Sequence, residues 1–215
     1  MSHQLRREII DVARRTSMTC LTQGTSGNVS ARVAGGFVVT PTGVPYEELQ
    51  PRDLVLLDLE GHAEPGQRRP SSEWRIHRDI YAAREDVGAV VHAHPTFATT
   101  IACLRRDLPA VHYMIAMAGG ADVRCAAYAT FGTEELSRNV LAALEGRKAC
   151  LLANHGIVTV GSDLARALRT AEEIERVAEL YWRALSVGEA VLLDEDEMAR
   201  VLARFGDYGQ QPRRR

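Results

Sequence analysis

Apolar residues recur at helical spacing near the start of the chain, where Leu5, Ile9, Val12 and Ala13 are separated by polar residues. Residues three and four apart lie on one face of a helix, so this pattern predicts an amphipathic helix from residue 4 to about residue 20. The same period predicts further helices over 74–81, 96–104, 133–144 and 162–187, and a last helix that begins among the acids at 194–197. Ser71 and Ser72, and later Ser162, precede two of these helices as expected caps.

Short apolar runs bounded by Pro, Gly or Asp predict strands at 37–40, 54–59, 87–94, 124–128, 149–152 and 157–160. Residues 23–30 (QGTSGNVS) are rich in glycine and hydroxyl side chains and predict a loop. Strands and helices alternate without repeats or a long linker, which favours a layered α/β domain. The pattern leaves both a parallel and an antiparallel sheet open.

The length and charge of the chain limit the classes of protein to which it can belong. The chain has 215 residues, 46% of them apolar and 25% charged, which predicts one folded domain over 1–215 with a flexible tail from about residue 210. The net charge is −2, and three of the positive charges are the terminal Arg213, Arg214 and Arg215. An acidic body without a basic stripe argues against a nucleic-acid partner.

The chain contains no apolar stretch close to the roughly 18 residues that a membrane span needs, and its first residues lack the apolar core of a signal peptide. We therefore expect a cytoplasmic protein without a membrane partner. Its four cysteines, at positions 20, 103, 125 and 150, form no CxxC pair, so we expect buried free thiols.

His92-Ala93-His94 at the end of an apolar run is the strongest local chemical signal. Side chains two apart in a strand point to the same face, so both imidazoles can bind one metal ion, whereas on a helix they diverge by about 200°. His155, between two apolar runs and before Gly156, offers a third ligand. Three histidines leave a tetrahedral zinc one open position, as in catalytic sites. The alternative is a group of histidines with satisfied N–H groups, and His3, His62, His77 and His112 are expected at the surface or in packing roles.

Two segments could bind a phosphate. Ser71-Ser72-Glu73 lies at a predicted helix start, where hydroxyls, free backbone N–H groups and the helix dipole favour an anion. A plain helix cap is the alternative. Residues 23–30 could wrap an oxyanion with backbone amides, but they lack the lysine of a P-loop and the GxGxxG spacing, so a nucleotide is not indicated.

Several motifs together resemble a known family. They are residues 24–30 (GTSGNVS), 41–43 (PTG), 71–73 (SSE), 92–94 (HAH), 112–114 (HYM), 128–133 (YATFGT), 154–156 (NHG) and 208–209 (YG). In this order and spacing they resemble the class II zinc-dependent aldolases, typified by L-fuculose-phosphate aldolase, over nearly the whole chain. The resemblance implies a three-layer α/β/α fold with a mixed, mostly antiparallel sheet. It also implies a homotetramer with active sites between subunits.

By position, the resemblance assigns zinc to His92, His94 and His155, and the acid/base role to Glu73. Tyr113 would act as proton donor in a neighbour's site. The substrate phosphate would be held by Thr25, Asn28, Thr42, Gly43, Ser71 and Ser72. The implied reaction is zinc-dependent cleavage of a ketose 1-phosphate, of the L-fuculose 1-phosphate type, to dihydroxyacetone phosphate and an aldehyde.

The chain's single lysine, Lys148, stands at a predicted strand start, away from every candidate site. This argues against a Schiff-base aldolase. The same fold is shared by L-ribulose-5-phosphate 4-epimerases, by a methylthioribulose-1-phosphate dehydratase and by the non-catalytic adducin scaffolds. Glu73, where the epimerases typically carry Asp, favours the aldolase, and the intact histidines argue against a scaffold. Asn154 stands where relatives often carry another histidine.

Overall fold

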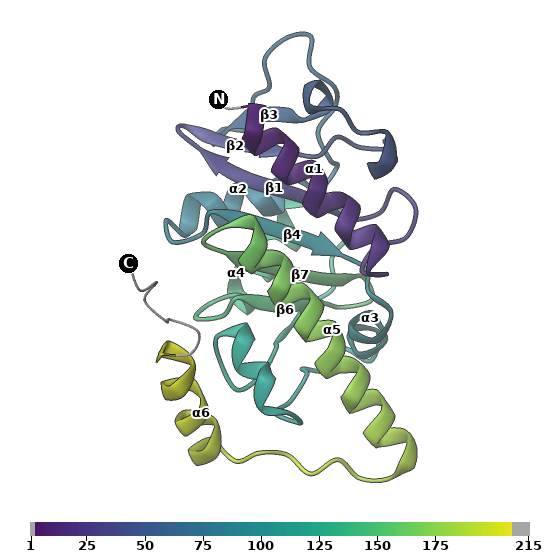
Figure 1. Cartoon of the computed structure of the whole chain (residues 1–215), viewed down its shortest axis with the longest axis vertical. Helices are drawn as coiled ribbons and strands as arrows, with labels where there is room; N and C mark the ends of the chain where they lie inside the picture. The colour runs from purple at the N-terminus through teal and green to yellow at the C-terminus, as the bar shows by residue number, and fades with distance from the viewer. Residues whose placement is uncertain (1–2, 208–215) are drawn as a thin grey trace, which may run out of the picture.

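A computed structural model of the chain, which describes residues 3–207, has one mixed sheet with helices on both faces (Figure 1). Its helices are α1 (His3–Met18), α2 (Trp74–Ala83), α3 (Thr96–Cys103), α4 (Glu134–Ala143), α5 (Leu164–Val187) and α6 (Glu195–Asp207), with 3-10 helices η1 (Tyr46–Glu48), η2 (Pro51–Asp53) and η3 (Tyr113–Ala118). Its strands are β1 (Asn28–Val33), β2 (Gly36–Val39), β3 (Val55–Asp58), β4 (Ala89–Ala93), β5 (Cys125–Ala126), β6 (Ala149–Leu152) and β7 (Gly156–Gly161).

The seven strands lie in the order β3-β2-β1-β4-β7-β6-β5. Every neighbouring pair is antiparallel except β5 and β6, which are parallel. This confirms the expected mixed, mostly antiparallel sheet.

Two hydrophobic clusters lie on opposite faces of the sheet. One packs α1, α3, α5 and η3 against the sheet, and the other packs α2 and α4 against its far side (Figure 1). Alternate residues of β4 serve both: Val91 belongs to the first cluster and Val90 to the second. Because both faces are covered, β4, β6 and β7 are mostly apolar runs without regular polar alternation, which is why the sequence revealed them.

Three expectations were wrong. Residues 28–30, expected in the loop 23–30, belong to β1, because the alternate polar residues Asn28 and Ser30 are buried under α2 instead of facing water. Glu73, not Ser71 or Ser72, is the residue before α2, and it makes no side-chain cap bond. Asp163 instead of Ser162 caps α5, since its carboxylate reaches the backbone N–H of Arg166 at 2.8 Å.

The four cysteines are free, as expected, but only Cys150 is buried. Cys20 and Cys103 are exposed because both lie at the ends of helices, in the residues that turn toward the next element. Among residues 3–207, no helix has the length and apolar character required to cross a membrane. Tyr208, Gly209 and the expected flexible tail lie outside the described residues.

Candidate metal centre and active site

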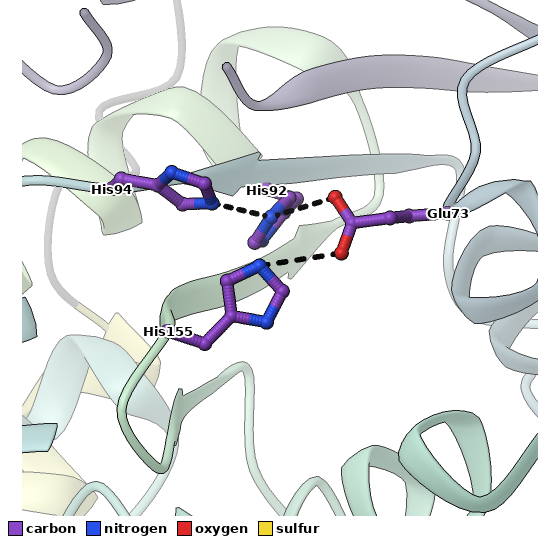
Figure 2. Close-up of side chains that lie close together, drawn as sticks. All are labelled: Glu73, His92, His94 and His155. Atoms are coloured by element: carbon purple, nitrogen blue, oxygen red, sulfur yellow. Dashed lines mark hydrogen bonds and ion pairs between the residues drawn. The ribbon is translucent and has the colours of Figure 1, made fainter. Parts of the chain in front are cut away.

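The strand register brings the start of β1, the end of β4 and the start of β7 side by side at one end of the sheet. β1 starts at Asn28, which pairs with His92 near the end of β4, and His92 in turn pairs with Val158 near the start of β7. Because β1 and β7 both run antiparallel to β4, their first residues lie beside the last residues of β4. The start of α2 covers the same end and brings Glu73 to it (Figure 2).

His92 and His94 converge, as their spacing predicted. The Nε2 atoms of the two rings lie 3.0 Å apart, with His92 in β4 and His94 directly after it. The Nδ1 atom of His92 lies 2.8 Å from the carbonyl oxygen of Ile157. A proton on Nδ1 is donated to this carbonyl, which orients the ring so that Nε2 faces the site.

His155 joins them from the turn between β6 and β7. The next residue must be glycine, because a Cβ at position 156 would lie 2.3 Å from the carbonyl oxygen of Ala93. This close approach brings the turn against the end of β4. The ring centroid of His155 lies 4.9 Å from those of both His92 and His94.

Glu73 closes the cluster from the helix side, and its side chain is almost fully buried. Its Oε2 lies 3.0 Å from Nε2 of His92 and accepts a hydrogen bond of 3.1 Å from Nδ2 of Asn28. Its Oε1 lies 3.3 Å from Nε2 of His155 (Figure 2). Among residues 3–207, Oε1 has no hydrogen-bond partner although it is buried.

Burial and the neighbouring charges shift the pKa of all four side chains in the cluster. Burial raises the pKa of Glu73, but the neighbouring His92 and His155 outweigh it and hold that pKa well below its usual range. Burial and the other imidazoles lower the pKa of His94 to about 3 and that of His155 to about 4. For His92, the Glu73 carboxylate outweighs burial and raises the pKa. Neutral His94 and His155 rings are therefore available as metal ligands at neutral pH.

The four residues fit a metal ion. One ligand atom from each of Glu73, His92, His94 and His155 lies within 4.8 Å of all the others. Three imidazole nitrogens and a carboxylate are typical donors for zinc and related first-row divalent ions. Oε1 of Glu73 accepts no hydrogen bond among residues 3–207, which further favours a cation here, because a buried carboxylate oxygen without a hydrogen bond is otherwise costly. The structure therefore contains a metal-binding cluster.

A cavity of about 340 Å³ opens beside this cluster. It is lined by Thr25, Ser26, Gly27, Asn28, Pro41, Thr42, Ser71, Ser72, Glu73, His94, Tyr128, Ala129, Phe131, Asn154 and His155. Of the expected phosphate-binding residues, only Gly43 is not part of this lining, although it follows Thr42 directly. Tyr113 is half exposed on η3 and lies outside this cavity.

His77 was expected at the surface or in a packing role, and the structure places it in the interior. His77 is fully buried and bonds to Asn28 and Ser30 behind the site. Its spacing of four residues from Glu73, one helical turn, was the available signal. Of the other histidines, His62 is exposed as expected, and the side chain of His112 caps η3.

Tyr128 and Phe131 also line the cavity, although no role was predicted for either. Asn154 has a positive φ of 54° and accepts a 2.8 Å hydrogen bond from Nε of Arg105, whose guanidinium lies 5.7 Å from the ring centre of Tyr128. Arg105 therefore links the turn that carries His155 to the cavity wall.

Comparisons with known proteins agree with this geometry. Residues 7–182 match the family model described as "Class II Aldolase and Adducin N-terminal domain". A 5-methylthioribulose-1-phosphate/5-deoxyribulose-1-phosphate aldolase of Rhodospirillum rubrum is 54% identical over 95% of this chain and 92% of its own. An L-fuculose phosphate aldolase of Escherichia coli is 46% identical over 96% of both chains. A solved L-fuculose 1-phosphate aldolase superposes with a TM-score of 0.93 at 43% identity, covering 96% of this chain and 98% of its own. The chain therefore belongs to the class II aldolase family.

Proposed function

We propose that the protein cleaves a ketose 1-phosphate between C3 and C4, with zinc held by His92, His94 and His155. The observation that carries this proposal is the buried carboxylate of Glu73, which lines the same cavity as the hydroxyl-rich segments and whose Oε1 accepts no hydrogen bond among residues 3–207. A proton-transfer group, a metal cluster and a phosphate cradle thus share one cavity.

The substrate phosphate is held by neutral donors in this proposal. Thr25, Thr42, Ser71 and Ser72 line the cavity, and the last two precede the N-terminus of α2, where the helix dipole favours an anion. The backbone at Gly43 has a φ of +69°, which lets the chain turn directly after Thr42. Asn28 has a second amide hydrogen beyond the one that it gives Glu73.

When bound, zinc supplies Lewis-acid stabilisation of negative charge on substrate oxygens. In the condensation direction the ionised Oε1 of Glu73 removes the proton from C3; in cleavage the carboxyl first takes up a proton from solvent and then gives it to C3. Tyr113 of a neighbouring subunit exchanges the proton at the oxygen that becomes the aldehyde. Its position on η3, half exposed and outside its own chain's cavity, supports a homotetramer with shared sites.

The cavity also supports a choice of substrate. Tyr128, Ala129 and Phe131 add apolar surface to a lining that is otherwise polar, which suits an aldehyde with an apolar end. L-fuculose 1-phosphate ends in a methyl group, and 5-deoxyribulose and 5-methylthioribulose 1-phosphates end in a methyl or a thioether. The relatives named for these compounds are 46% and 54% identical to this chain, so we propose ketose 1-phosphates without a terminal hydroxyl as its substrates. Four cysteines that form no disulfide in the described structure, and a phosphorylated substrate, support a cytoplasmic location.

Release of dihydroxyacetone phosphate from a panel of ketose 1-phosphates tests the function. The panel contains the three compounds above and fructose 1-phosphate, whose terminal carbon carries a hydroxyl. We expect activity on at least one of the three, weaker activity on fructose 1-phosphate, and one zinc per chain in the active sample. Zinc-loaded protein that released no dihydroxyacetone phosphate from any of them would overturn the proposal. L-ribulose 5-phosphate is tested as an additional substrate, and its epimerisation, or dehydration of 5-methylthioribulose 1-phosphate, would assign the chain to the alternative reactions of this fold.

A further inference from the structure

A continuous line of buried polar side chains runs from Glu73 into the protein interior. Asn28 Nδ2 donates to Glu73 Oε2 at 3.1 Å, and Asn28 Oδ1 lies in close hydrogen-bond contact with Nε2 of His77. On its other side, Nδ1 of His77 lies 2.6 Å from Oγ of Ser30, which lies 2.7 Å from the hydroxyl of Tyr81. None of the five residues is more than 6% exposed.

Two regular elements build this line. Glu73, His77 and Tyr81 are each four residues apart at and after the start of α2, so they form one stripe along the helix. Asn28 and Ser30 are two apart in β1, so they share one face of the sheet. The stripe and the strand face each other, and each helix residue bonds to a strand residue.

The ionised carboxylate of Glu73 determines which group donates and which accepts in each hydrogen bond of the line. An ionised carboxylate only accepts hydrogen bonds, so Asn28 must turn its amide nitrogen toward Glu73 and its Oδ1 toward His77. Oδ1 can only accept, so Nε2 of His77 must carry a proton. Burial lowers the pKa of His77 to about 3, which keeps the ring neutral and leaves Nδ1 as an acceptor. Ser30 then donates to Nδ1 and accepts from Tyr81.

Without the donor on Nε2, the orientation of Asn28 loses its support from behind. A flipped amide would place Oδ1 about where Nδ2 now lies, opposite Oε2 of Glu73, with two acceptors facing each other. Glu73 would then lose the hydrogen bond from Asn28, and His92 would be the remaining contact given for Oε2 among residues 3–207.

We propose that His77 is a positioning residue: by donating from Nε2 it fixes the amide of Asn28, which holds Oε2 of Glu73 and leaves Oε1 as the oxygen that exchanges the substrate proton. This inference rests on the proposed role of Glu73 as acid/base. His77 itself neither lines the cavity nor belongs to the cluster of Glu73, His92, His94 and His155.

Two substitutions of His77 distinguish a positioning role from a packing role. In His77→Gln the amide nitrogen lies near the place of Nε2 and can still donate to Asn28. In His77→Asn the shorter side chain reaches only the place of Nδ1, beside Ser30, and loses the contact with Asn28. We expect His77→Gln to retain kcat within about threefold. We expect His77→Asn to lower kcat by about 10- to 100-fold, the usual range for partners behind a site residue, while zinc content stays at one per chain.

Nitrogen-15 NMR of the wild-type protein provides a second readout that needs no variant to fold. The line of hydrogen bonds requires the tautomer of His77 with the proton on Nε2, which has a different pair of ring nitrogen shifts from the Nδ1–H form. Equal kcat values for folded His77→Gln and His77→Asn would overturn the inference, and so would an Nδ1–H tautomer. Wild-type protein without aldolase activity would overturn the proposed function and with it the role given to Glu73, whereas the tautomer alone reports on the hydrogen-bond line.

Discussion

Gly27→Ala tests whether the segment before β1 must lie where the structure has it, and Gly24→Ala is its matched control. Both glycines have positive φ values, +79° and +63°, a region that costs other residues about 1–2 kcal/mol. The space around the two glycines differs. A Cβ at position 27 would lie 2.7 Å from the carbonyl oxygen of His92 and 2.9 Å from Oγ1 of Thr22, whereas a Cβ at position 24 would have no atom of the described residues within 4 Å.

The expected magnitudes follow from these two terms. Gly24→Ala lowers the free energy of unfolding by about 1–2 kcal/mol, from the backbone alone. Gly27→Ala adds about 1–3 kcal/mol of overpacking, giving a total of about 2–5 kcal/mol. The pairing of His92 with Asn28 and Val158 holds the carbonyl that the new methyl group meets, so residues 25–27 must move instead. We therefore expect KM for the ketose 1-phosphate to rise more in Gly27→Ala.

Urea unfolding and steady-state kinetics measure both effects. Protein and zinc concentrations are held equal, because metal binding and assembly shift the apparent stability. Equal losses of stability in the two variants, with equal KM values, would refute the reasoning, since only the contacts with His92 and Thr22 distinguish them.

Three further predictions concern the metal and the proton-transfer groups. Chelation should abolish activity, and added zinc should restore it. His92→Ala should lower the zinc content below one per chain, whereas His62→Ala, at an exposed position, should not. Loss of metal in both variants would contradict the ligand assignment. Glu73→Gln should keep zinc but lose about 10²- to 10⁴-fold in kcat, so near-normal turnover would exclude Glu73 as the acid/base. Co-refolded Glu73→Gln and Tyr113→Phe chains should regain activity that each variant alone lacks, and verified mixed assemblies no more active than the averaged parents would argue against shared sites.

Most of the helices and the apolar strands could be predicted because each carries a local period. The long helix α5 (Leu164–Val187) was predicted over 162–187, and β6 was predicted with its observed bounds. The metal-binding histidines could also be found locally, since spacing by two in a strand places His92 and His94 on one face. His155 could be proposed from its position between two strands.

β1 could not be predicted because its sequence pattern is compatible with both a loop and a strand. Polar Asn28 and Ser30 alternating with apolar residues is typical of a loop or of a strand with one face in water, but here the polar face is buried. Their partner His77 is a single histidine among the apolar residues of a helix, which nothing in the local pattern separates from a packing residue. The contact between them joins residues 47 and 49 positions apart.

The sequence by itself therefore determined the ligand types, their spacing and the helices and strands that carry them, because these depend on periods of two and 3.6 residues within one segment. Only the tertiary structure decided that β1, β4 and β7 meet at one end, since strand register is set by pairing between distant segments. The packing of α2 on β1 then decided which polar groups are buried together. The direction of the hydrogen bonds from Glu73 to Tyr81 follows from that packing, because each buried donor must find an acceptor among the groups that the fold places beside it.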